Sequence, residues 1–166
     1  MKFKFLTLIA VVSLFSLTSC GGGKKTDKPA ETSAKQEVKK EEPKVSSTKI
    51  DLTAPTMNNQ GVGKYKDIKV ADKVDETMAA KGKEMYKNKC TACHKFKKRY
   101  IGPALKGVTQ RRSAAWIMNM VTNAKEMLEK DPVAKALITE YHAPMAQQDM
   151  NDDEVKALYE YLRTKN

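Results

Sequence analysis

The apolar positions divide this chain into a hydrophobic start, a long polar stretch and a helical remainder. Residues 5–17 form a mostly apolar run behind Lys2 and Lys4, which is typical of a secretory signal and short for a membrane span. From residue 20 to about residue 49, Gly, Lys, Glu, Thr, Ser and Pro dominate. Such a composition cannot bury enough surface to offset its ordering entropy. We therefore predict a signal peptide over residues 1–19 and a disordered tether over residues 20–49.

Residues 50–74 show no clear hydrophobic period. Their apolar side chains are scattered among Gly, Lys and Asp, and Gly61-Val62-Gly63 favours a bend. We expect an extended arm that packs on the folded domain and could include a short strand.

From about residue 75 to the end, apolar residues recur at spacings of three and four, which is typical of helices packed on one face. No segment there alternates as a strand would. This pattern predicts an all-α fold of about four helices over residues 75–166. The expected helices are 76–90, 113–122 with the only tryptophan, 132–141 and 151–164.

Gly82 is the unusual residue of the first expected helix. It shares a stripe with Met85 and Tyr86, yet a glycine inside a helix costs about 1 kcal/mol relative to alanine. The cost makes sense if another helix crosses closely at this point. The last helix is the expected neighbour, and Asn151 with Glu154 fits a capping box at its start.

The stretch Cys90-Thr91-Ala92-Cys93-His94 carries the clearest chemistry of the chain. The spacing C-x-x-C-H is the attachment site of c-type haem. Two cysteines three positions apart on a helical turn place both sulfurs on one porphyrin edge, and the adjacent imidazole can then reach the iron. A bare C-x-x-C would also fit zinc, dithiol redox chemistry or chance. The adjoining His94 favours one covalent haem c with its iron, and such an apolar group would also complete the core of a small domain.

Leu17-Thr18-Ser19-Cys20 resembles a bacterial lipobox, which would make Cys20 the first mature residue and the site of lipidation. The alternative is an ordinary signal peptide with a chance cysteine. The chain has 3 cysteines, and this reading assigns one to lipid and two to haem. Several acyl chains on one residue would hold the protein firmly at a membrane.

Several segments follow one another in a set order around the haem motif: Gly82–Tyr86, Cys90–His94, Ile101–Val108, Pro144-Met145 and Asn151–Leu162. With them the chain resembles the small class I bacterial cytochromes c over roughly residues 76–166. Residues 1–75 lie outside the resemblance. The family implies a small helical fold wrapped around one covalently attached haem.

The resemblance also implies roles for single residues. His94 is expected as the proximal iron ligand, and the Gly102-Pro103 turn as the one whose carbonyl receives the other imidazole N–H, a bond that fixes ring orientation and basicity. Leu105 would pack on the haem. Met145 would supply the distal sulfur ligand.

Two neighbours compete with Met145 for the distal position. In the family the ligand methionine commonly lies about six positions before the cap of the last helix, which fits Met145 and the cap Asn151. Met150, directly before the cap, would then be a hydrophobic staple. His142 would give a bis-histidine haem, and an open or other distal site also remains an alternative.

Methionine ligation would carry a functional consequence. A thioether favours the reduced iron and raises its potential. Histidine and methionine together would fill both axial positions, so no site would remain for a substrate. An iron of this kind suits electron transfer and not bond chemistry.

The formal net charge is +11, and it is unevenly distributed. The surroundings of the haem motif are strongly basic, whereas the last helix and the loop before it are acidic. A basic patch near the haem edge would steer docking with an acidic redox partner. Nucleic-acid binding is not expected, because the chain is exported and its basic stretch lacks interleaved aromatics. The basic residues are Lys81, Lys83, Lys87, Lys89, Lys95, Lys97, Lys98, Arg99, Lys106, Arg111 and Arg112, against Glu84 alone.

These features predict an exported electron carrier that is anchored to a bacterial membrane by lipid, carries its haem domain in the periplasm and is not an enzyme. A haem-based sensor or weak peroxidase is the alternative if the distal ligand is labile. A thiol–disulfide oxidoreductase using Cys90 and Cys93 is opposed by His94 and by the lack of a strand–helix pattern.

Overall fold

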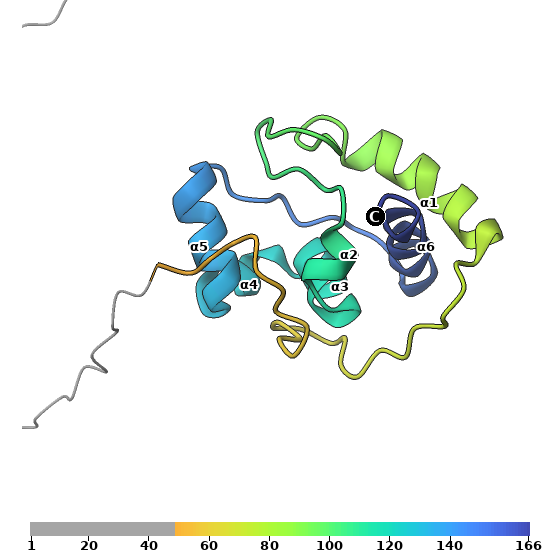
Figure 1. Cartoon of the computed structure of the whole chain (residues 1–166), viewed down its shortest axis with the longest axis horizontal. Coiled ribbons are helices and arrows are strands. Elements are labelled where there is room, and N and C mark those ends of the chain that lie inside the picture. Colours follow the sequence, from red (N-terminus) through yellow and green to blue (C-terminus); the bar gives the residue numbers. More distant parts are fainter. Residues whose placement is uncertain (1–48) are drawn as a thin grey trace, which may run out of the picture. The chain divides into compact units, whose positions relative to one another are not determined.

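Residues 49–166 are the part of the chain that the computed structural model of this protein describes (Figure 1). They belong to one compact unit. The predicted signal peptide, the predicted lipidation site Cys20 and the predicted tether through residue 48 lie outside the described residues. Within residues 49–166, no helix is both long enough and apolar enough to cross a membrane.

The described residues form six helices and no named strand, which confirms the all-α fold. All four expected helices are present, with bounds within one or two residues of the prediction. Two short helices, α2 and α4, are added to them, so the expectation of about four was too low. The helices are α1 (Glu76–Lys89), α2 (Val108–Arg111), α3 (Ala114–Thr122), α4 (Ala124–Lys130), α5 (Pro132–Tyr141) and α6 (Asp152–Arg163).

The two helices at either end of the domain, α1 and α6, pack on each other as Gly82 predicted (Figure 1). A Cβ atom at Gly82 would collide with the backbone carbonyl of Ala157 in α6. Glycine is therefore required here for the close helix approach. The capping box of α6 is also present: the Asn151 side chain accepts from the Glu154 N–H at 3.0 Å, and the Glu154 carboxylate accepts from the Asn151 N–H at 2.9 Å.

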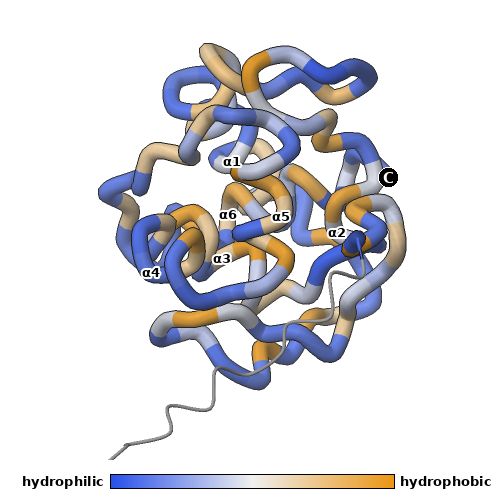
Figure 2. Tube along the Cα trace, turned by 90° about the vertical axis from the view of Figure 1, so that its left-hand side faces the viewer, coloured by the Kyte–Doolittle hydropathy of each residue, from blue (hydrophilic) through white to orange (hydrophobic). Residues whose placement is uncertain are grey.

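The apolar core lies between α3, α6 and the segments that surround them. Figure 2 shows hydrophobic positions along α3, α5 and α6, with hydrophilic positions on the outer loops. Trp116 and Met118 of α3, Met127 of α4 and Leu158 of α6 are buried in one cluster. The core therefore forms one wall of the cavity described below.

The arm before α1 is held by polar side chains and not by a strand. Asn119 of α3, which is 0% exposed, donates to the carbonyls of Gln60 and Tyr65 at 2.9 Å each and accepts from the Tyr65 N–H at 3.1 Å. The short strand considered for this arm is reduced to one parallel bridge between Thr56 and Arg112. Since buried backbone groups need partners, these bonds take the place of a sheet.

Candidate functional site

The two motif cysteines lie on a turn that extends α1. Cys90 caps the helix, and its N–H donates to the Tyr86 carbonyl at 2.9 Å. The N–H groups of Cys93 and His94 both donate to the Cys90 carbonyl, at 3.1 and 2.9 Å. The turn brings both thiols and the imidazole to the same cavity, since all three residues line it.

The two thiols differ in their surroundings. Cys93 is exposed, whereas Cys90 is half-buried. Burial raises the pKa of the Cys90 thiol to about 11. A thiol in this state stays protonated at neutral pH, which is unlike the activated thiolate of a dithiol oxidoreductase.

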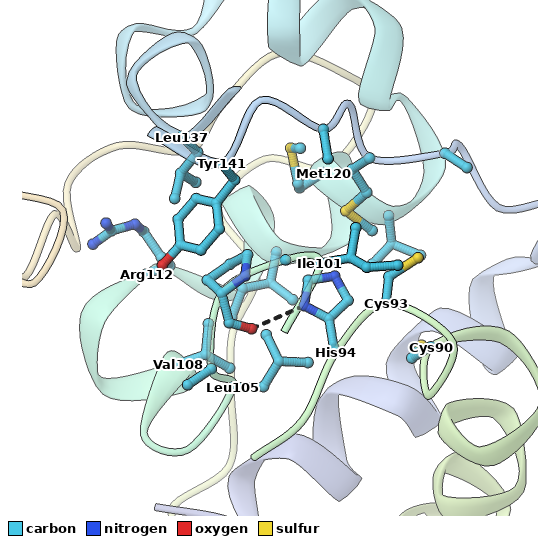
Figure 3. A pocket seen from close by; sticks show the side chains of 18 of the residues that line it. Cys90, Cys93, His94, Ile101, Leu105, Val108, Arg112, Met120, Leu137 and Tyr141 are labelled. Atoms are coloured by element: carbon cyan, nitrogen blue, oxygen red, sulfur yellow. Dashed lines mark hydrogen bonds between the residues drawn. The ribbon is translucent and has the colours of Figure 1, made fainter. Parts of the chain in front are cut away.

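The imidazole of His94 is oriented by one hydrogen bond. Its Nδ1 lies 3.0 Å from the carbonyl oxygen of Pro103, drawn as the dashed line in Figure 3. A carbonyl can only accept, so Nδ1 carries a proton, and in the neutral ring Nε2 then keeps its lone pair. The ring is thereby in the tautomer that a metal ligand requires.

Gly102 makes room for this ring. A Cβ atom at Gly102 would lie 2.5 Å from His94 Cε1 and 2.9 Å from its Nδ1. The Gly102 N–H in turn donates to the Cys93 carbonyl at 2.9 Å. The predicted Gly102-Pro103 turn therefore both cradles the imidazole and bonds to it.

Aromatic rings pack around the segment that carries His94. The Tyr86 hydroxyl donates to the His94 carbonyl at 3.1 Å. The Tyr86 and Phe96 rings stack with centroids 4.6 Å apart, and Tyr161 of α6 packs edge-on against Phe96 at 5.8 Å. The histidine is thus fixed to both α1 and α6.

The two motif cysteines, His94 and Tyr86 line a cavity of about 220 Å³. Its walls come from all six helices and from the loops after His94 and α5. Figure 3 shows the His94 ring between the cysteines and the apolar side chains of this cavity. Every residue that the sequence assigned to haem lines it: Cys90, Cys93, His94, Gly102, Pro103, Leu105 and Met145.

The three candidates for the distal ligand are placed differently. Met145 is half-buried and lines the cavity. Met150 is 7% exposed in the core and is not among the lining residues. His142 is exposed at the left-handed C-cap of α5 and does not line the cavity either. The geometry favours Met145 over the other two.

Many of the lining residues were missed by the sequence reasoning, and three of them bear on haem binding. Met120 of α3 is buried at the cavity and adds a second thioether. Leu52 of the arm also reaches it. Arg112 lies in the wall, 4% exposed, and donates to the Leu52 and Ala54 carbonyls at 2.7 and 2.8 Å. The helical period places Met120 on a buried face, but no sequence signal links the arm or Arg112 to the cavity.

The residues present fit a haem c. Two thiols and a correctly oriented imidazole face one predominantly apolar cavity, and a thioether lies in the same lining. Burial lowers the pKa of the Arg112 guanidinium from its ordinary value, but an arginine remains charged. This cation suits a group that carries carboxylates. Zinc fits less well, because residues 49–166 hold no cluster of three or more His, Cys, Asp or Glu side chains.

Comparison with known proteins points to the same chemistry. A family model described as cytochrome c matches residues 79–166, more than half of the chain. A "cytochrome c-553-like" protein of Synechocystis sp. is 31% identical over 87 residues, which cover 52% of this chain and 68% of that protein.

Solved structures agree with the sequence comparison. A cytochrome c from Rhodothermus marinus is 36% identical with a TM-score of 0.60, covering 61% of this chain and 88% of its own. An engineered form of that protein, described as bound to a carbene intermediate, is 35% identical with a TM-score of 0.57 and the same coverages. Both extend the likeness from sequence to the arrangement of the helices.

Proposed function

Because this chain belongs to the cytochrome c family, whose members carry one covalently attached haem c with its iron and transfer electrons through it, we propose that it is a membrane-anchored monohaem electron carrier of the bacterial periplasm. In this proposal it passes single electrons between respiratory redox proteins and is not itself an enzyme. The observation that carries the proposal is the single cavity lined by Cys90, Cys93, His94 and Met145.

The protein side of the proposal follows from this geometry. Haem supplies one-electron chemistry at its iron. Cys90 and Cys93 would hold it covalently, His94 would supply a nitrogen ligand and Met145 a sulfur ligand. The apolar lining would exclude water, and a thioether ligand would raise the potential. With both ligands supplied by the chain, no site on the iron would remain for a substrate.

The docking surface proposed for a redox partner is centred on Ile101, which lines the cavity and is 47% exposed. The adjacent Tyr100 is 52% exposed. Lys97 and Lys98 lie beside them and are exposed. An apolar centre with basic residues near it suits a partner of opposite charge. Arg99 was counted in this patch by sequence, but its guanidinium is paired with Glu140 at 2.8 Å.

The optical spectrum of the purified protein is the decisive experiment. A closed His94–Met145 iron predicts the weak red charge-transfer band of sulfur–iron ligation in the oxidised form. It also predicts no response of the reduced form to carbon monoxide. A missing band with rapid carbon monoxide binding would contradict the electron-carrier proposal.

That second outcome would favour a haem-based sensor or weak peroxidase. One observation supports this second candidate: residues 143–147, which contain Met145, make no hydrogen bond to other elements of the described chain. A segment held so sparsely could release its ligand.

Docking is tested by reversing charge at Lys97 and Lys98 while Arg99 is kept. The double Lys97→Glu/Lys98→Glu variant should slow reduction by an acidic redox protein at low salt, and the difference should shrink as salt rises. A Lys125→Glu/Lys130→Glu variant, changed on α4, is the charge-matched control. Equal rates in the two variants at low salt would remove the docking surface from the proposal.

The membrane anchor depends on Cys20. Cys20→Ser should release the protein from membranes into the soluble fraction, because the remaining chain would carry no acyl group. Full membrane retention of this variant would contradict lipid anchoring and leave the haem chemistry untouched.

A further inference from the structure

The segment that carries the distal methionine is fixed at its two ends. At its start it continues from α5, where the His142 N–H donates to the Ile138 carbonyl at 2.9 Å. At its end the Gln148 N–H donates to the Val121 carbonyl of α3 at 2.8 Å. The position of Met145 therefore depends on how firmly the C-terminal end of α5 is held.

One side chain from outside α5 holds that end of the helix. Arg99 donates from Nη1 to Glu140 Oε1 and from Nη2 to the Glu140 carbonyl, both at 2.8 Å. Its guanidinium also stacks on the Tyr141 ring, 4.3 Å from the ring centroid. Glu140 and Tyr141 are the last two residues of α5, and Met145 follows four residues later. Tyr141 itself points into the cavity in Figure 3.

Arg99 lies on a loop that is closed by backbone hydrogen bonds. The loop begins directly after His94 and is closed by three backbone bonds: Gly102 N–H to the Cys93 carbonyl, Tyr100 N–H to the Gly102 carbonyl and Leu105 N–H to the Lys95 carbonyl, at 2.9 to 3.1 Å. Figure 1 shows this green loop reaching toward the blue end of α5. The side chain of Arg99 thus spans from the proximal loop to the start of the distal segment.

We propose that Arg99 is a positioning residue for the distal ligand: it clamps the end of α5 to the proximal loop and so keeps Met145 closed over the iron. This inference rests on the proposed function, specifically on Met145 as the distal ligand. It deepens that function, because it names the contact that sets how often the iron opens to other ligands.

The clamp is expected to act on local opening more than on global stability. The Arg99 and Glu140 side chains are about half exposed, and a single exposed ion pair contributes little to folding. Arginine is suited to the role because its planar fork makes two directed bonds while its face stacks on a ring. Lysine can supply the charge but not this geometry.

The test measures binding of imidazole to the oxidised protein at saturating imidazole, where departure of the methionine sulfur limits the rate. The experiment uses the full haem-loaded chain at a pH where imidazole is uncharged. Arg99→Gln should bind imidazole about five- to tenfold faster than the unchanged protein, as expected for losing one charge-assisted contact with stacking. The rate of imidazole binding to Arg99→Lys should fall between the rates for Arg99→Gln and for the unchanged protein. Thermal unfolding should shift only slightly in both variants.

Two control variants separate the clamp from charge and from packing. Lys135→Gln removes an exposed cation from the first half of α5, away from Glu140, and should leave the rate unchanged. Glu140→Gln should raise the rate in the same direction as Arg99→Gln. The double variant should then show less than the product of the two single effects.

The outcomes distinguish the clamp from the function on which it rests. Met145→Ala should lose the sulfur–iron band and bind imidazole without delay. If it keeps the band, the ligand assignment fails. If Met145→Ala opens the iron while Arg99→Gln binds imidazole no faster than Lys135→Gln, the clamp is overturned and the electron-carrier function stands.

Discussion

The two sides of the haem cavity are held by different means. On the proximal side His94 adjoins a cysteine of the attachment motif, bonds to the Pro103 carbonyl and fits against Gly102. On the distal side Met145 belongs to residues 143–147, which make no hydrogen bond to other described elements. His94, the proposed proximal ligand, is therefore held by several contacts, whereas Met145, the proposed distal ligand, depends on contacts at the ends of its segment.

The contrast shows where this protein can be adjusted. Removing one support of His94 leaves others in place, so the proximal bond should persist in most variants. Removing one support of Met145 changes the rate at which its sulfur leaves. Potential and access to the iron should therefore respond to distal changes, and folding and haem retention to proximal ones.

The largest effect is expected from His94→Ala. It removes the proximal nitrogen and the bond to Pro103, and it leaves a gap beside Gly102. We expect loss of stable haem ligation and of the folded state, which means the whole of a stability of about 5–15 kcal/mol. Circular dichroism and the haem spectrum check this. A red, folded variant with unchanged spectrum would show that the proximal side is not what holds the haem.

Met145→Ala should have the next largest effect and a different character. Haem should stay attached through Cys90, Cys93 and His94, stability should fall by about 2–4 kcal/mol, and the potential should drop because a thioether favours reduced iron. Denaturant unfolding and redox titration measure the two quantities.

Met150→Ala and Met120→Ala are the matched controls for that experiment. Both truncate a buried methionine, so both should lose stability while they retain the sulfur–iron band. If Met120→Ala loses the band and Met145→Ala keeps it, the distal ligand comes from α3 and the contrast between the two sides is wrong.

Gly102→Ala tests the proximal cradle. The added Cβ would lie 2.5 Å from the imidazole, so the ring must shift, at a cost of about 1–3 kcal/mol. The haem spectrum should change with it. Gly107→Ala is the control: its φ of 67° makes a side chain strained at about 1–2 kcal/mol, but it does not touch His94. Identical haem spectra in the two variants would mean that Gly102 does not set the ring position.

The smallest effects are expected from replacing one proline on each side of the haem cavity. Pro103→Ala and Pro144→Ala should each lose about 0.4–1 kcal/mol, because each frees the unfolded chain. The Pro103 carbonyl that accepts from His94 is retained in the variant. Only Pro144→Ala is expected to speed imidazole binding, and stopped-flow absorbance measures this rate. Equal rates in both variants would contradict the looser distal side.

Much of the fold could be predicted from sequence because its signals are local. A period of three to four residues predicted α3, α5 and α6 within one or two residues, and a capping box marked the start of α6. Gly82 predicted the crossing of α1 and α6, which the backbone of Ala157 confirms. The two helices that were missed, α2 and α4, are only 4 and 7 residues long, too short to show a period.

The candidate site likewise has a part that the sequence could predict and a part that it could not. The cofactor could be predicted because a covalent motif places two thiols and an imidazole within five consecutive residues. Leu52, Met120 and Arg112 could not be assigned to the cavity, since they come from separate segments. Arg99 was taken for a free surface cation because the sequence does not show that Glu140, 41 residues away, lies beside it.

The sequence by itself determined the helical period, the caps, the attachment motif and hence the family and its cofactor. Only the tertiary structure decided how the arm is held and how the distal segment is supported. These segments are held by single polar contacts between residues far apart in the sequence, such as that of Asn119 with Tyr65, which are 54 positions apart. A helical period or a haem-attachment motif can be recognised from neighbouring residues, whereas such a contact exists only once the chain has folded.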